Sequence, residues 1–79
     1  MIRTKVSKDD LLKWLNARLA ENEDFQNCSF TSIMRLAEED KNGCNWSGAN
    51  VRCSGVPATV CEPEAMRIVT EAKERFNLI

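Results

Sequence analysis

The stretch Asn42–Gly55, NGCNWSGANVRCSG, decides the fold that the sequence predicts. It begins with Asn-Gly, the dipeptide most typical of a two-residue type I′ hairpin turn, because both central residues of that turn need a positive φ. The preceding segment 28–40, CSFTSIMRLAEED, fits either a short helix or a strand by its apolar spacing. The Asn-Gly pair favours the strand. We therefore predict an antiparallel hairpin that turns at Asn42-Gly43.

Pairing the strands outward from a two-residue turn sets the register. Leu36 then faces Ala49 and Met34 faces Val51, which gives the sheet one mostly apolar face. A slip of one residue would destroy this match, because neighbouring side chains point to opposite faces. The opposite, mostly polar face gathers Trp46, Ile33, Arg35, Asn50 and Arg52.

A helix is predicted on the N-terminal side of the hairpin. Ser7 occupies a typical N-cap position, and Leu11, Leu15 and Leu19 recur at helical period after it. The polar run that follows ends the helix near Glu21.

A second helix is predicted after the hairpin, with Pro63 in its first turn and Asn77 at its end. Its apolar stripe consists of Ala65, Ile68, Val69, Ala72 and Phe76. The expected fold is α+β, a helix–β-hairpin–helix (αββα) in a single domain of residues 1–79. Both helices pack on one face of a two-stranded antiparallel sheet.

Composition narrows the function classes. The net charge is -1 and the pI about 5.4, with Lys and Arg scattered among acids, which argues against a nucleic-acid partner. The chain has neither the apolar run of a signal peptide nor a membrane span, so we expect a cytoplasmic protein without membrane contact. Cytoplasmic thiols are normally kept reduced.

The chain contains no histidine, which excludes imidazole acid–base chemistry and mixed Cys/His zinc sites. The carboxylates lie at turns and helix starts, where solvated acids are ordinary. Paired-carboxylate catalysis needs an enclosed site that separates two pKa values, for which 79 residues leave little room. We predict no enzyme, no catalytic residue and no cofactor.

The four cysteines are separated by gaps of fifteen, eight and seven residues, whereas zinc knuckles bring ligands as close pairs. On one strand Cys44 and Cys53 lie about 30 Å apart and on opposite faces. Cys44 is expected to be exposed beside the turn. Cys28, Cys53 and Cys61 gather at the open end of the hairpin, as packed free thiols, a disulfide or a metal site. These alternatives stay open, and we assign no metal ligand.

The polar face defined above is the candidate binding site, because an exposed Trp among Arg and aliphatic side chains is typical of interaction hot spots. Alternatively, a segment such as residues 1–6 covers it, or Trp46 tucks onto the first helix. The predicted function is a non-catalytic protein-interaction or regulatory module with an unknown protein partner. The alternative is a cysteine-based metal-binding or redox-responsive protein. Unpaired sheet edges would also allow a homodimer through edge-to-edge pairing, and the oligomeric state stays open.

Four features together resemble a family of small uncharacterised bacterial proteins. They are GCNWS (43–47), RCSGVP (52–57), Cys61 and RFNL (75–78), and the resemblance covers Phe30–Leu78. It implies no activity and carries over no functional residue.

Overall fold

The computed structural model describes residues 3–79. Two helices and four strands follow one another along the chain, with a single 3₁₀ turn between α1 and β2. Their bounds are β1 Thr4–Val6, α1 Lys8–Ala20, η1 Glu23–Phe25, β2 Cys28–Arg35, β3 Trp46–Cys53, α2 Ala58–Arg75 and β4 Phe76–Leu78.

The strands form two separate sheets. β2 and β3 pair antiparallel, as expected, whereas β1 and β4 pair parallel with Thr4 opposite Phe76 and Val6 opposite Leu78. The predicted helix–hairpin–helix with one two-stranded sheet is therefore wrong, although the fold is a small α+β one. Strands of three residues are too short to show an alternating pattern, so β1 and β4 could not be predicted from the residue pattern.

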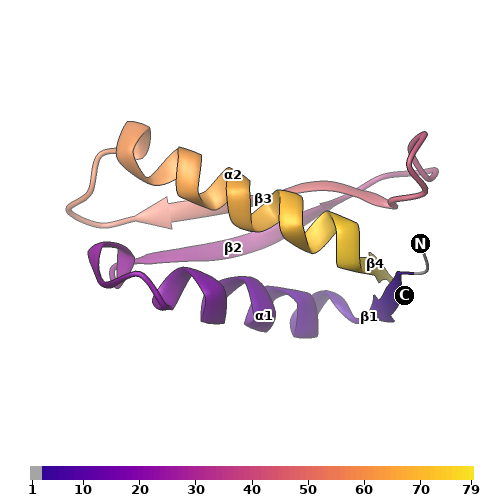
Figure 1. Cartoon of the computed structure of the whole chain (residues 1–79), viewed down its shortest axis with the longest axis horizontal. Coiled ribbons are helices and arrows are strands. Elements are labelled where there is room, and N and C mark those ends of the chain that lie inside the picture. Colours follow the sequence, from indigo (N-terminus) through magenta and orange to yellow (C-terminus); the bar gives the residue numbers. More distant parts are fainter. Residues whose placement is uncertain (1–2) are drawn as a thin grey trace.

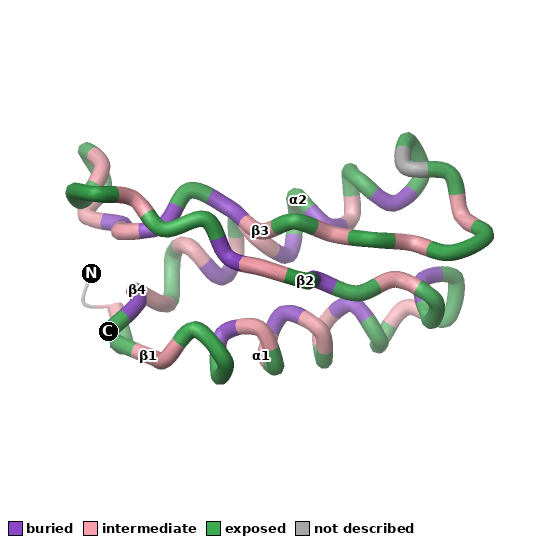
Figure 2. The backbone as a smooth tube through the Cα atoms, turned by 180° about the vertical axis from the view of Figure 1, so that it is seen from behind, coloured by how far each residue is buried: buried purple, intermediate pink, exposed green. Residues whose placement is uncertain are grey.

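The two helices lie side by side and cover the β2–β3 sheet (Figure 1). α1 contacts β2, α2 contacts β3, and the β1–β4 pair lies where the two ends of the chain meet. Buried positions recur along both helices and along β2 and β3, and Leu78 of β4 is buried as well (Figure 2). The core consists of Leu11, Leu15, Leu19, Phe25, Phe30, Ile33, Cys44, Trp46, Cys61, Ala65, Ile68, Ala72 and Leu78.

The first helix confirms its prediction. The Ser7 hydroxyl oxygen accepts a hydrogen bond from the Asp10 N–H at 3.1 Å, and three leucines at helical period are fully buried. Arg18 in its last turn forms a bidentate ion pair with Glu71 of α2, which lowers the pKa of the Glu71 carboxyl. The pair joins the two helices over the core.

The second helix is longer at its start and shorter at its end than predicted. It begins at Ala58, where the Cys61 N–H already donates to the Pro57 carbonyl at 3.3 Å, so Pro63 lies inside the helix. Pro63 has no backbone N–H, so the helix lacks one intrahelical hydrogen bond near its start and continues past this residue. At Phe76 the backbone becomes extended (φ -129°, ψ 145°) and continues as β4 instead of reaching Asn77 as helix.

The hairpin register also differs from the prediction. Arg35 pairs with Trp46, and residues 36–45 form the connection in place of a two-residue turn. Gly43 has the positive φ (+84°) expected of its position, but within this wider loop. Irregularities between Phe30 and Ser32 and between Met34 and Arg35 shift the pairing further.

Asp40 organises the loop. One of its carboxylate oxygens accepts the N–H groups of Cys44 at 3.0 Å and Asn42 at 2.8 Å. These two hydrogen bonds lower the pKa of the Asp40 carboxyl, and the bond from Cys44 has the larger effect. An Asx-type turn at Asp40 thus replaces the predicted type I′ turn.

Asn45 attaches the loop to the C-terminal strand. Its side-chain amide donates to the Leu78 carbonyl and accepts from the Leu78 N–H, both at 2.8 Å, as a neighbouring strand would. Asn77 forms the same kind of contact in the opposite direction, from β4 to the loop. Its Oδ1 accepts from the Asn45 N–H, and its Nδ2 donates to the Gly43 carbonyl. The two asparagines therefore connect β4 to the start of β3.

We predict that Asn45→Ala lowers the free energy of unfolding by about 1–3 kcal/mol, because the N–H and carbonyl groups of the buried residue Leu78 lose their partners. Urea unfolding followed by circular dichroism measures the change. Asn50→Ala is the matched control, since the Asn50 side chain is exposed and bonds only the Ser32 hydroxyl among the described residues. Equal effects of the two substitutions would contradict the role of Asn45.

Candidate functional site

The predicted interaction face does not exist as a surface. Trp46 is fully buried, and its indole N–H donates to the Phe76 carbonyl at 3.0 Å. Ile33 is only 5% exposed and belongs to the core. Placing both side chains on an exposed face was wrong. The strand irregularity between Phe30 and Ser32 interrupts the alternation of β2, so that Ile33 is buried together with Phe30, and Trp46 belongs to the same core.

The three polar members of that face are exposed but do not form one cluster. Arg35 pairs with Trp46 and Arg52 with Ser29, so six positions of β2, or about 20 Å, separate the two arginines. Arg35 donates to the Ile79 carbonyl at 2.8 Å. Binding of a protein by Arg35, Asn50 and Arg52 stays a prediction.

Cys44 was expected to be exposed and is buried instead, at 1% exposure. Its Sγ lies 3.2 Å from the Trp46 carbonyl oxygen, to which the thiol donates. Cys44 therefore acts as a small core side chain beneath the loop.

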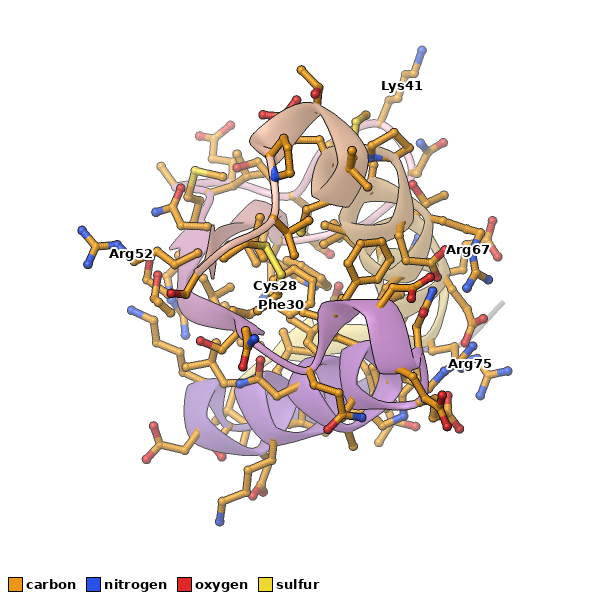
Figure 3. The ribbon with its side chains drawn as sticks, turned by 90° about the vertical axis from the view of Figure 1, so that its left-hand side faces the viewer. Cys28, Phe30, Lys41, Arg52, Arg67 and Arg75 are labelled. Atoms are coloured by element: carbon orange, nitrogen blue, oxygen red, sulfur yellow. A yellow bond between two sulfur atoms is a disulfide. The ribbon has the colours of Figure 1, made fainter. Side chains whose placement is uncertain are left out.

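Three cysteines from three elements meet at the far end of the hairpin. Cys28 begins β2, Cys53 ends β3, and Cys61 lies in the first turns of α2. Cys28 and Cys53 are directly opposite in the sheet and form a disulfide, visible beside the Cys28 label in Figure 3. The Cys61 thiol is free, and its Sγ lies 2.7 Å from that of Cys53. All three Sγ atoms lie within 4.8 Å of one another.

The short connection from β3 to α2 brings Cys61 to the disulfide. The Ser54 N–H donates to the Asn27 carbonyl at 3.1 Å, which extends the hairpin pairing past Cys53. Gly55 then adopts φ +78°, a left-handed conformation that glycine reaches without steric cost. Pro57 caps the start of α2, so that Cys61 points back at β3.

The cluster is partly shielded from water. Cys61 is 1% exposed, whereas Cys28 and Cys53 are half-buried. Burial raises the pKa of the Cys61 thiol, and the charge of Glu62 raises it further. A cavity of about 160 Å³ opens beside the sulfurs, and its lining is Val51, Cys53, Val56, Cys61 and Glu62.

This geometry permits thiol–disulfide exchange. A thiolate at Cys61 is already in contact with one sulfur of a disulfide, and such exchange proceeds by attack of a thiolate on a disulfide sulfur. The raised pKa keeps Cys61 mainly in its thiol form at neutral pH, which makes the reaction slow but does not remove it.

A larger hollow lies elsewhere, between β3 and α2. It has a volume of about 580 Å³, and exposed methionines Met34 and Met66 lie on its walls. None of the three clustered cysteines lines this hollow. Two members of the cluster, Cys53 and Cys61, line the smaller cavity instead.

Comparison with known protein families, curated proteins and solved structures finds no match for this chain. The resemblance to a bacterial family therefore stays a prediction. Among residues 3–79, neither helix has the length and apolar character that crossing a membrane requires.

The sequence predicted part of this site. It placed Cys28, Cys53 and Cys61 together at the open end of the hairpin, and the structure brings these three together. It left open whether they were free, bonded or metal-bound. The directly opposed positions of Cys28 and Cys53 are the missing signal, and only the correct register reveals them.

We predict that reducing the disulfide lowers the free energy of unfolding by about 3 kcal/mol, because the bond closes a loop across a sequence separation of 25 residues in the unfolded chain. Urea unfolding with and without a phosphine reductant measures the difference. Cys44→Ser should show the same difference, since Cys44 is not part of the bond. An unchanged unfolding midpoint on reduction would contradict the prediction.

Proposed function

We propose that the chain is a small redox-responsive protein that works through thiol–disulfide exchange among Cys28, Cys53 and Cys61. The observation that carries the proposal is the position of the free, buried Cys61 thiol beside the Cys28–Cys53 disulfide, with the three Sγ atoms all within 4.8 Å of one another. A disulfide with no thiol beside it can exchange only with thiols from outside the chain. A thiol held against it gives the bond a second partner.

The exchange step needs no external oxidant. The Cys61 thiol loses its proton to solvent, and its thiolate attacks the Cys53 sulfur. The Cys53–Cys61 bond forms as the Cys28–Cys53 bond breaks, and the electron pair leaves on Cys28, which takes up a proton. The number of disulfides and of thiols is the same before and after.

The exchange would change which elements are joined. The present bond joins β2 to β3, and the alternative bond joins β3 to α2. Cys28 is the first residue of β2, so its release frees the beginning of that strand from its covalent attachment. The position of the disulfide then controls how firmly β2 and the preceding 3₁₀ turn are held.

We also propose a cytoplasmic location. Stable structural disulfides are rare in the cytosol, and those present there are usually transient, catalytic or redox-sensing. A half-buried disulfide in contact with a free thiol is suited to that setting, because small thiols can reach it through the adjoining cavity.

A non-catalytic protein-interaction role stays a prediction. The burial of Trp46 removes one argument for it, because a buried Trp cannot be the centre of a binding hot spot.

Edge-to-edge pairing of two chains also stays a prediction.

Trypsin mapping tests the exchange. Cys28 lies in tryptic peptide 19–35, whereas Cys53 and Cys61 share peptide 53–67. The protein is held at pH 8, quenched with acid, and alkylated in denaturant with N-ethylmaleimide. Exchange converts the bond between two peptides into one within peptide 53–67 and leaves Cys28 alkylated. We expect alkylation of Cys28 about tenfold above its level in Cys61→Ser, which lacks the attacking thiol and cannot form the bond within peptide 53–67.

Cys44→Ser is the matched control, because it also removes one buried free thiol but leaves the cluster intact. It should exchange as the unmodified chain does. A complementary variant, Cys28→Ser, should form the Cys53–Cys61 bond when oxidised with glutathione disulfide. If Cys28 alkylation equals that of Cys61→Ser, and Cys28→Ser forms no such bond, the proposed function is wrong.

The exchange rate should rise about tenfold per pH unit between pH 7 and pH 8, because the raised pKa leaves Cys61 mostly protonated in that range. Glu62→Gln should increase the rate at pH 7, since removing the negative charge lowers the pKa and raises the thiolate fraction. Glu38→Gln makes the same charge change on the distant loop and should have no effect. Stopped alkylation time courses measure both rates, and equal rates in the two variants would contradict this cause.

A further inference from the structure

The three sulfurs of the cluster are also arranged as ligands for one soft metal ion. Each comes from a different element, and all lie within 4.8 Å of one another. Two thiolates on a tetrahedral zinc ion lie about 3.8 Å apart, given Zn–S bonds of about 2.3 Å. Opening the disulfide therefore requires only small movements of sulfur to reach a three-thiolate arrangement.

The surroundings provide a fourth coordination position. The cavity of about 160 Å³ borders Cys53 and Cys61, and a water molecule is far smaller than this volume. Catalytic zinc sites in proteins have three protein ligands and a water or substrate molecule in the fourth position. Glu62 also lines the cavity, and its carboxylate adds negative charge near the position that a cation would occupy.

We propose that the reduced chain binds one Zn²⁺ through the thiolates of Cys28, Cys53 and Cys61, and that the disulfide excludes the ion. This inference rests on the proposed redox function, since it names the ligand that the reduced state of the same cluster takes. Disulfide sulfurs have no thiolate charge, so only Cys61 is left as a ligand in the oxidised chain.

The chemistry balances with a dithiol or phosphine as the reductant. The reductant supplies two electrons to the Cys28–Cys53 bond, which becomes two thiols, and is itself oxidised. Zinc then displaces the protons of three thiols as it binds, so binding strengthens as the pH rises. In the reverse direction, glutathione disulfide takes up two electrons and becomes two glutathione thiols, which restores the Cys28–Cys53 bond and releases the ion.

The cluster differs from the fourth cysteine in a way that makes the test specific. Cys44 is buried beside Trp46 at the opposite end of β3 and belongs to no ligand cluster among the described residues. Cys44→Ser and Cys61→Ser each remove one buried free thiol, yet only the second removes a proposed ligand.

Zinc titration in competition with a chromophoric chelator tests the proposal on the chain reduced by a phosphine. We expect one ion per chain for the unmodified chain and for Cys44→Ser, an affinity about a hundredfold lower for Cys61→Ser, and no binding to the oxidised chain. Cobalt(II) should give the thiolate charge-transfer and tetrahedral absorption bands in the same two variants. Zinc should also raise the thermal midpoint of the reduced chain in these variants, which detects binding even where reduction loosens the fold.

Equal zinc affinity of Cys61→Ser and Cys44→Ser would overturn the proposal, and so would equal binding by the oxidised chain or the absence of stoichiometric binding. The phosphine opens the disulfide without any attack by Cys61. A failed zinc titration therefore leaves the exchange result standing, and a failed exchange experiment leaves the zinc result standing.

Discussion

The burial of Trp46 is the constraint on which the rest of the fold depends. A buried indole N–H needs an acceptor, and the Phe76 carbonyl provides it where α2 changes into β4. This bond requires the chain end to lie beside the start of β3. The parallel β1–β4 pair and the Asn45–Leu78 bonds are built around the same position. Trp46 thereby joins the hairpin, the second helix and both ends of the chain.

The same constraint explains why the register could not be obtained from the turn. Asn42-Gly43 favours a two-residue loop, and that loop would send Trp46 outward with Arg35 and Asn50. Burying Trp46 contributes about 3–5 kcal/mol, judged by the usual cost of truncating a buried Trp. A preferred turn type contributes much less, so the loop widens to residues 36–45 and Asp40 supplies the hydrogen bonds that stabilise it.

Local signals predicted well what local interactions determine. Ser7 and the leucine period of α1 lie within one helix, and the structure reproduces both. β1 and β4 were missed because their stability comes from partners more than seventy residues away in the chain. The cysteine cluster could be predicted only in part. Its three members follow from any hairpin that ends near Cys53, whereas the choice of bonded pair depends on the register.

The two ends of the hairpin are held by different means, and this limits what a redox change can do. At the Trp46 end, packing and hydrogen bonds hold the strands, and the Cys44 thiol there donates to a backbone carbonyl without meeting a second sulfur among the described residues. At the other end, the disulfide joins the strands where β2 begins. Opening it leaves the Trp46 contacts unchanged, so a loss of order would start at Cys28 and spread along β2 only as far as Phe30 and Ile33. These buried side chains resist further separation, because exposing them costs about 1.5–3 kcal/mol each. A response confined to one end is what a small chain needs if it is to change state without unfolding.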